Sequence, residues 1–481
     1  MSRPEDRPDS PAPRPPGRRG LAALLAAFME EHNILWGELV GGLLVIGCST
    51  ALVISLWHTL SENPLFKFAT FTGAVSAVYG AGLYTLRRWK LESTSRGLLL
   101  MALLLTPLAE LALTSGGSGR LALPTQVAAL LILGLLAWRA ARVLAPDGPW
   151  LLAAAVVLTS ACQLPVARMV EAGVGAARFV ALSLLPAVCL VAVTAAFLWQ
   201  LSATALDNRR SASVFVFLGV GTFSLLVVLG FAVFLHGDVA TALGKLALPA
   251  AVAGLAPLVG GAFVHRGLAD YAGELSLVEE GEDERSEGRW ASVRTGGTTV
   301  ALTGIVVMLL AVGLAWPQPQ TVLAVCALDF VALTVVALRF GLPVAHAVAL
   351  PCLTGAYLMA WFLSRGLLQV PDDELPARML ELMEAPATGT AILVLFALCS
   401  VVSELLARWV AGEHGKFYAF GSAGIALLSL AFVTPHGLQE PARALIVYAV
   451  TGIGALLLNL RWRRAEATSA GLVLLIGATL W

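Results

Sequence analysis

Long apolar runs recur along the whole chain and constrain its fold more than any other feature. Fourteen of them hold about 20 residues each, the length that crosses a bilayer core as a helix, and a fifteenth stops at the last residue. In hydrocarbon a backbone segment must satisfy its own N–H and C=O groups, which a helix does along its length. The sequence therefore predicts an all-α fold, a polytopic membrane bundle of about 14 full transmembrane helices plus a truncated fifteenth. The runs cover residues 37–58, 66–86, 96–114, 121–139, 149–167, 178–200, 213–235, 244–264, 297–315, 320–339, 344–363, 388–407, 417–434, 443–460 and 469–481.

The composition of the chain excludes a soluble enzyme that is attached to the membrane by a single transmembrane anchor. Hydrophobic residues make up 58% of the chain and charged residues only 13%, against about 25% charged residues in soluble domains. Cations and anions balance at 31 each, so nothing favours binding to nucleic acid. The six cysteines all lie inside apolar runs and are interpreted as packing residues, not as disulfides or metal ligands.

The distribution of Lys and Arg orients the predicted helices. With the N-terminus in the cytoplasm, 23 of the 31 cations fall on the cytoplasmic side, as the positive-inside rule requires. We therefore expect a protein of the bacterial cytoplasmic (inner) membrane, with the lipid bilayer as its surroundings. The eight cations on the outer side are Lys67, Arg120, Arg168, Arg178, Lys245, Arg365, Arg378 and Arg443.

Three segments outside the runs carry their own signals. Residues 1–35 read as a disordered Pro/Arg-rich cytoplasmic tail that contains a short amphipathic helix at 21–29. Residues 265–296 contain an acidic cluster and read as a flexible cytoplasmic loop. In the outer loop 364–387, Leu375, Met379, Leu380 and Met383 recur at helical spacing, which predicts a short helix on the outer surface.

Two basic stretches resemble each other and indicate an internal repeat. Residues 86–100, LRRWKLESTSRGLLL, share the order Leu, basic cluster, Glu, Thr-Ser-x-Gly and Leu with residues 460–474, LRWRRAEATSAGLVL. We interpret the chain as parallel six-helix units: helices 1–6 in residues 36–200, helices 7–12 in 201–407, and the start of a third unit in 408–481. The last run, 13 residues, would cover only about 20 Å of a roughly 30 Å core. We therefore expect the natural chain to continue past Trp481.

Ionisable residues inside the runs are the candidates for an intramembrane polar site, because charge is costly in hydrocarbon. Asp329 lies in the middle of its run, where it either binds a proton or ion or forms a structural hydrogen bond between helices. His346 on the next run is its possible partner. Glu110, three residues after Pro107, is near the outer end of its helix and is expected to reach water.

Glu404 is the fourth candidate, and it lies one helical turn before Arg408. That spacing favours an ion pair at the inner interface.

Known catalytic motifs are absent from the sequence. The chain has no phosphate-binding G-x-x-x-x-G-K-[ST], no H-E-x-x-H and no G-x-S-x-G, so no catalytic, cofactor-binding or metal-binding residue is assigned. An enzyme is therefore the less favoured reading. Three functions stay open: a transporter or permease with a polar site between helices, a structural or assembly protein without a substrate, and an intramembrane enzyme acting on lipid-linked substrates.

The first predicted hairpin also resembles a family. It combines Gly41-Gly42, Trp57, Pro64 and Lys67 with a second helix and a basic loop. Over roughly residues 36–110 this order is similar to bacterial multi-pass membrane proteins of unknown function, in which a glycine-rich helix ends in a Trp and a short loop leads to a Lys. The resemblance implies a fold of successive helix pairs and implies no catalytic residues.

The cation distribution generates a topology prediction. We expect reporter fusions at residues 90 and 280 to report a cytoplasmic location and a fusion at residue 375 to report the outer side. An alkaline phosphatase fusion, which is active only outside, checks each position. Phosphatase activity at residue 90 or 280 would contradict the orientation.

Overall fold

The computed structural model describes residues 44, 47, 48, 51, 64–114, 122–171, 176–202, 208–275, 284–371, 373–409 and 412–481. The chain divides into two units, Met1–Thr59 and Leu60–Trp481. The N-terminal tail, its amphipathic helix and nearly all of the first apolar run lie outside the described residues. Every element named below belongs to the second unit.

Helices follow one another throughout the described part of the second unit, and no strand occurs there. They are α3 (Pro64–Tyr84), the π-helix η1 (Thr85–Trp89), α4 (Glu92–Thr114), α5 (Ala122–Leu144), α6 (Pro149–Ala161), α7 (Gln163–Glu171), α8 (Ala176–Ser202), α9 (Asn208–His236), α10 (Val239–Lys245), α11 (Ala247–Leu275), α12 (Glu284–Ala315), α13 (Pro319–Phe340), α14 (Ala345–Ser364), α15 (Leu375–Glu384), α16 (Pro386–Trp409), α17 (Gly412–Val433), the 3-10 helix η2 (Thr434–His436), α18 (Pro441–Trp462) and α19 (Ala465–Ala478).

Twelve spans in the described part of the chain are long and apolar enough to cross a membrane. They confirm the prediction of an all-helical protein with many membrane helices. The finer count of 14 plus one stays a prediction. Helix α3 coincides with the second predicted run but is not among the twelve, and α19 is a shorter apolar helix of 14 residues.

Two predictions about the long connections have different outcomes. The flexible loop expected at 265–296 is wrong for most of its length, because α11 continues to Leu275 and α12 begins at Glu284. The short helix expected in 364–387 is confirmed as α15. Its buried face consists of Leu375, Met379 and Leu382, whereas Leu380, which was expected on that face, is exposed. Positions 375, 379 and 382 follow the i, i+4, i+7 spacing of one helical stripe.

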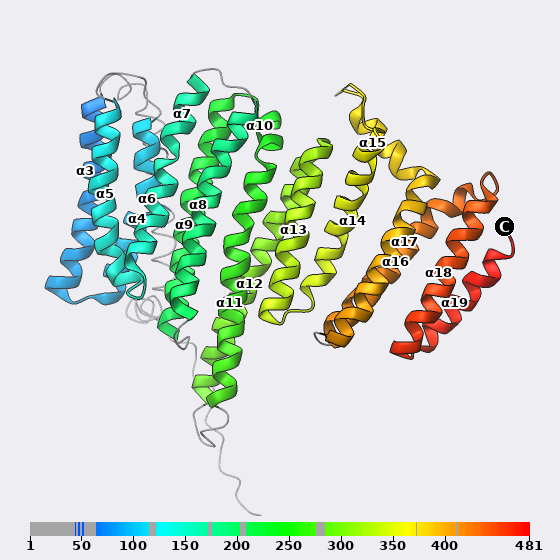
Figure 1. The fold of residues 1–481 in the computed structure, drawn as a ribbon. Helices are drawn as coiled ribbons and strands as arrows, with labels where there is room; N and C mark the ends of the chain where they lie inside the picture. The colour runs from blue at the N-terminus through cyan, green and yellow to red at the C-terminus, as the bar shows by residue number, and fades with distance from the viewer. Residues whose placement is uncertain are drawn as a thin grey trace, which may run out of the picture. The chain divides into compact units, whose positions relative to one another are not determined.

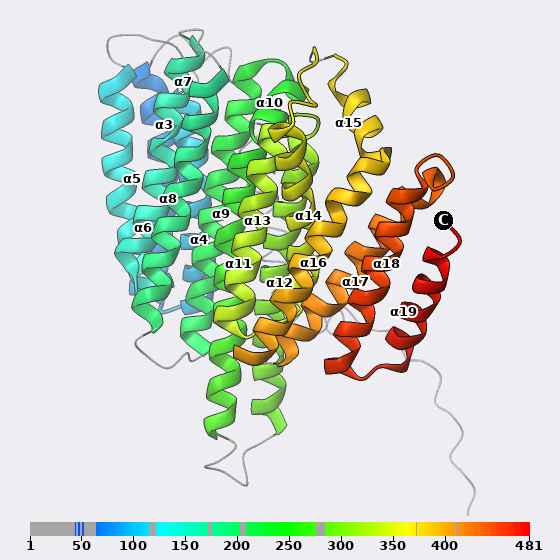
Figure 2. The same cartoon turned by 45° about the vertical axis from the view of Figure 1, so that its right-hand side comes forward.

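The helix ends within the second unit alternate between two sides (Figures 1 and 2). The far ends of α11 and α12, the adjoining ends of α16 and α17 and the α18–α19 connection lie at the lower side in both views. Helices α7, α10 and α15 lie at the upper side. The basic connections and the outer loop are therefore on opposite sides, as the alternation of cations in the sequence predicts; which side is cytoplasmic stays a prediction.

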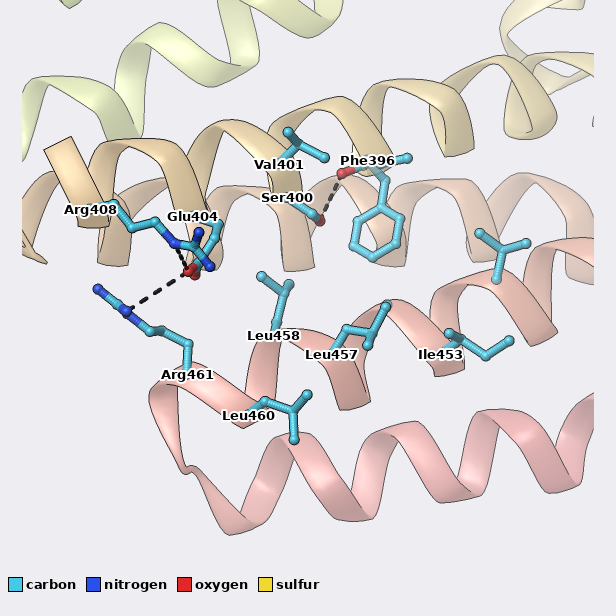
Figure 3. A pocket seen from close by; sticks show the side chains of 13 residues that line it. Phe396, Ser400, Val401, Glu404, Arg408, Ile453, Leu457, Leu458, Leu460 and Arg461 are labelled. Carbon is cyan, nitrogen blue, oxygen red and sulfur yellow. Dashed lines mark hydrogen bonds and ion pairs between the residues drawn. The ribbon is translucent and has the colours of Figure 1, made fainter.

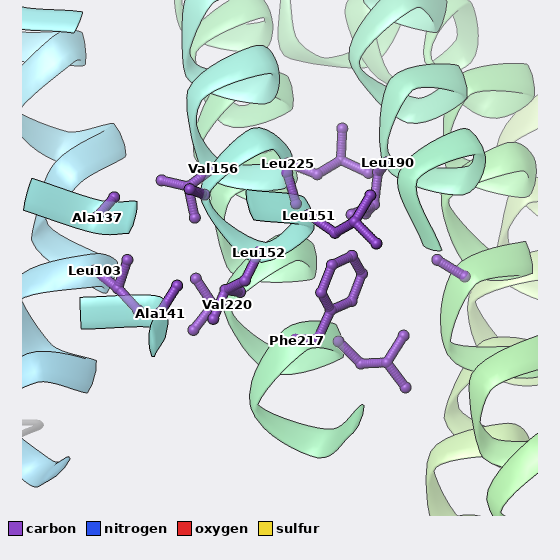
Figure 4. Packing of buried hydrophobic residues seen from close by; sticks show 14 of the residues in the cluster. Leu103, Ala137, Ala141, Leu151, Leu152, Val156, Leu190, Phe217, Val220 and Leu225 are labelled. Atoms are coloured by element: carbon purple, nitrogen blue, oxygen red, sulfur yellow. The ribbon is translucent and has the colours of Figure 1, made fainter. Parts of the chain in front are cut away.

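Apolar side chains fill the contacts between neighbouring helices. One large cluster is formed mainly by α3 to α9, and Figure 4 shows part of it, where Leu103 of α4, Ala137 and Ala141 of α5 and Leu151, Leu152 and Val156 of α6 meet Leu190 of α8 and Phe217, Val220 and Leu225 of α9. A second cluster is formed by α11 to α19, and a smaller one lies among α11 to α14. Because lipid is as apolar as these side chains, close packing and not the hydrophobic effect favours the contacts inside a bilayer.

Glycines bring α11 and α12 into the closest contact. A Cβ atom at Gly261 would lie 2.4 Å from the backbone N of Ala301, and one at Gly304 would lie 2.5 Å from the backbone N of Leu258. Gly254 and Gly297 face the same seam. The two helix backbones touch because no side chain separates them, which is how small residues promote helix association in membranes.

Glycines and serines connect α16 with α17 in the same way. The Ser403 hydroxyl donates to the carbonyl O of Gly415 over 2.8 Å, and the Ser429 hydroxyl donates to the carbonyl O of Gly389 over 2.6 Å. These contacts lie near the two ends of the helix pair. They fix the antiparallel register of α16 and α17 with buried hydrogen bonds.

The two basic stretches that resemble each other form similar hairpins. In each, a residue with left-handed backbone ends the turn two positions before the next helix: Lys90, with φ of 54°, and Arg463, with φ of 49°. When the two basic stretches are aligned from Leu86 and Leu460, Arg463 falls one position earlier than Lys90. The π-helix η1 explains the shift, because a π turn accommodates one more residue than an α turn. The division into six-helix units stays a prediction.

The seam between α11 and α12 generates a prediction about stability. We expect Gly304→Ala to lower the free energy of unfolding by about 1–3 kcal/mol, because the new Cβ would overlap the α11 backbone. Gly313→Ala on the same helix is the matched control, since nothing lies within 4 Å of its Cβ position. Thermal unfolding of the two variants in detergent measures the difference. Equal melting temperatures would contradict the proposed seam.

Candidate functional site

Asp329 lies in the middle of α13 and is completely buried, with 0% of its surface exposed. Its neighbours are Cys326 on the preceding turn of α13 and Cys352 of α14. Gly355 of α14 faces Cys326, with 3.1 Å between its Cβ position and the Cys326 sulfur. Asp329 therefore faces the neighbouring helices.

Neither carboxyl oxygen of Asp329 has a hydrogen-bond partner. The pairing with His346 is therefore wrong, and so is the structural hydrogen bond between helices. The antiparallel register of α13 and α14 gives the reason, because it places Cys352 beside Asp329. His346 lies six residues before Cys352, about 9 Å away along the helix axis.

His346 instead pairs with His414 of α17. The Nε2 atom of His346 and the Nδ1 atom of His414 are 3.0 Å apart, and the two side chains are 0% and 6% exposed. The Tyr418 ring packs against His346 with 5.0 Å between ring centroids. The second nitrogen of His346, Nδ1, is buried without a partner. His414 was not predicted as a partner of His346, because nothing in the spacing of these residues indicates that α14 and α17 meet.

Glu110 is buried as well, which contradicts the expectation that it reaches water. It is 1% exposed, and neither carboxyl oxygen has a hydrogen-bond partner. Glu110 is buried because the neighbouring helices α5 and α7 pack against this part of α4. Gln163 of α7 donates to the carbonyl O of Pro107 over 3.0 Å, one turn before Glu110, and Gln126 of α5 donates to the carbonyl O of Leu113 over 3.0 Å.

Further polar residues around α4 were missed by sequence reasoning. The Tyr79 hydroxyl of α3 lies 2.9 Å from the Thr106 hydroxyl of α4, and both residues are buried. Lys67 of α3, which the cation distribution places on the outer side, is 2% exposed. The sequence feature that could have identified these buried polar residues is the presence of Gln, Tyr and Lys in otherwise apolar runs.

Glu404 forms the predicted ion pair with Arg408. The Arg408 Nε atom donates to Glu404 Oε1 over 2.6 Å, and Arg461 of α18 approaches the same oxygen with its Nη1 at 3.8 Å. Glu404 lines an open cavity between α16 and α18, so it is partly exposed, whereas Asp329 is fully buried. The four candidates of the sequence therefore occupy separate places in the second unit: Asp329 in α13, His346 in α14, Glu110 in α4 and Glu404 in α16.

Metal binding has no support among the described residues, where no group of three or more His, Cys, Asp and Glu could hold an ion. All six cysteines are free thiols. Comparisons of the chain with protein-family models, curated proteins and solved structures find no match. The buried polar groups are therefore the main indication of function.

The unpaired burial of Asp329 generates a prediction about stability. We expect Asp329→Leu, which keeps the branched shape, to raise the free energy of unfolding by about 1–3 kcal/mol, because it removes a buried polar group without a partner. Glu413→Gln is the control: it breaks a partly exposed ion pair with Lys416 and should change stability by less than about 1 kcal/mol. Thermal unfolding in detergent compares them. Destabilisation by Asp329→Leu would mean that the carboxyl group has a stabilising partner.

Proposed function

We propose that the chain is a transporter or permease in which buried carboxyl groups take up and release protons or cations. One observation carries this proposal: Asp329 and Glu110 lie buried inside membrane spans, and none of their carboxyl oxygens has a hydrogen-bond partner. A carboxyl group kept for structure normally has a partner, because an unpaired buried polar group lowers stability. An unpaired one inside a membrane span is a candidate for function.

The chemistry of such groups suits coupled transport. An ionised carboxylate in apolar surroundings is far more costly than the neutral acid, so a change in its charge requires a proton, a cation or the arrival of water. A transporter supplies each of these when its helices move. Asp329, which sits halfway along a 22-residue helix, is at the depth where transporters bind their coupling ions.

The histidine pair supports the same proposal. His346 and His414 are buried, titratable and 3.0 Å apart on two different helices. Each is in the first turn of its helix, and therefore close to an end of the span. Two imidazoles at this distance can share one proton, and both being charged would be unfavourable. The pair is suited to exchange protons between the membrane surface and the interior.

A structural or assembly function is the second candidate, and the close glycine contacts favour it. The backbones of α11 and α12 touch, and buried serine hydrogen bonds join α16 to α17. Asp329 also lines neither of the cavities found beside α16 and α18 and beside the start of α13. In this case substitution of Asp329 would change stability alone. The intramembrane enzyme has the least support, because Glu404 is ion-paired and so is poorly placed as a free acid or base.

A transport assay separates these functions. Proteoliposomes of the full chain are given an acidic outside solution that contains amino acids, sugars, organic acids and metal cations. Mass spectrometry reads the solutes that accumulate, and a trapped dye reads the internal pH. We expect the wild type to accumulate at least one solute with internal acidification, and Asp329→Asn to reduce both to the level of empty liposomes.

The same assay contains its control. Glu413→Gln removes a carboxylate from an exposed ion pair at the end of α17 and should leave uptake unchanged. If wild-type liposomes accumulate no solute and acidify no faster than empty ones, the transporter proposal is wrong. The structural function then predicts that Asp329→Asn alters only the melting temperature.

A further inference from the structure

An open groove runs between α16 and α18 in the second unit. It has a volume of about 600 Å³, within the range of small-molecule sites, and Figure 3 shows the side chains that line it. One end is charged and holds Glu404, Arg408 and Arg461. The rest is apolar, with lining residues that include Phe396, Val401, Ile453 and Leu457.

The charged end carries an excess of positive charge. Glu404 contacts both arginines but can neutralise only one of them. The side chain of Arg408 is 62% exposed and that of Arg461 is 42% exposed, so both guanidinium groups have free donors toward the outside. Arg461 also donates through Nη2 to the carbonyl O of Ala407 over 3.3 Å, which holds it against α16. Two guanidinium groups held side by side suit a phosphate group, which they bind through paired hydrogen bonds.

The length of the groove matches one leaflet of a bilayer. From Arg408 to Phe396 on α16 there are 12 residues, or about 18 Å of helix, and half of a bilayer core is about 15 Å. The charged end lies in the last turns of α16 and α18, which we expect at the membrane surface because both helices have the length and composition of membrane spans. At the other end Phe396 packs against Gly454, where a Cβ atom would lie 2.6 Å from the Phe396 ring.

We propose that the groove between α16 and α18 binds one anionic phospholipid, with its phosphate on Arg408 and Arg461 and an acyl chain along the apolar wall. Charge complementarity and the match to one leaflet favour this occupant. Basic pockets between membrane helices are known to bind anionic headgroups. Exposed apolar residues on the wall, among them Val401, Ile453 and Leu457, are covered by the acyl chain.

Native mass spectrometry of the delipidated full chain in detergent tests the proposal. The probes are phosphatidylglycerol and phosphatidylcholine with the same oleoyl chains. We expect the wild type to bind phosphatidylglycerol at least about tenfold more tightly, which corresponds to about 1.4 kcal/mol. Arg408→Gln with Arg461→Gln should remove this preference. Ala397→Trp, which places a large ring on an exposed lining position, should weaken the binding of both lipids.

Two further variants keep the test decisive even if the double variant folds poorly. Glu404→Gln should tighten the binding of phosphatidylglycerol, because it removes the carboxylate that competes for the arginines. Arg443→Gln, at the opposite end of α18 and ion-paired with Glu440, is the matched control and should bind both lipids like the wild type.

Five results would overturn the proposal. The first four are equal affinity of the wild type for the two lipids, a preference that survives in the double variant, unchanged binding by Ala397→Trp, and displacement of the lipid by millimolar inorganic phosphate. The displacement by phosphate would assign the arginines to a free phosphate and leave the apolar wall without a role. Weaker binding of phosphatidylglycerol by Glu404→Gln would equally contradict it.

Discussion

Backbone polar groups have no water to bind inside a bilayer, and the architecture of this chain depends on that constraint. The described spans answer it with the hydrogen bonds of helices, and the span Pro149–Val166 does so with two successive helices, α6 and α7. The helices must then associate without help from the hydrophobic effect, so contact of their backbones becomes important. The contacts of Gly261 and Gly304 with the facing backbones of α12 and α11 illustrate this, as does the hydrogen bond from Ser429 to Gly389.

Close packing of this kind explains how the protein tolerates polar groups that reduce its stability. Asp329 and Glu110 are buried without hydrogen bonds, and we expect each to lower the free energy of unfolding relative to an apolar residue. They persist only because the surrounding helices are held by many other contacts. Such groups are a reason to consider function first, since packing alone would favour a residue like Leu at either position.

The groove between α16 and α18 shows a different use of charge at the membrane. There Arg408 and Arg461 lie at the ends of their helices, partly exposed, with Glu404 between them. Arginines in this position can extend their charged groups toward the headgroups while their stems stay in apolar surroundings. The buried carboxyl groups therefore suit proton or ion chemistry inside the bundle, whereas the groove suits lipid at its surface.

The sequence by itself determined what depends on neighbours along the chain. Apolar runs of helical length located the spans, the period of the apolar residues located α15, and the i,i+4 spacing predicted the ion pair of Glu404 with Arg408. Only the tertiary structure decided which helices meet and at what register. It covered Glu110 with α5 and α7, placed Cys352 beside Asp329, and paired His346 with His414, which lies 68 residues away. The physical reason is that any two apolar helix faces can pack, so contacts between helices depend on the fit of glycines and side chains across the whole bundle.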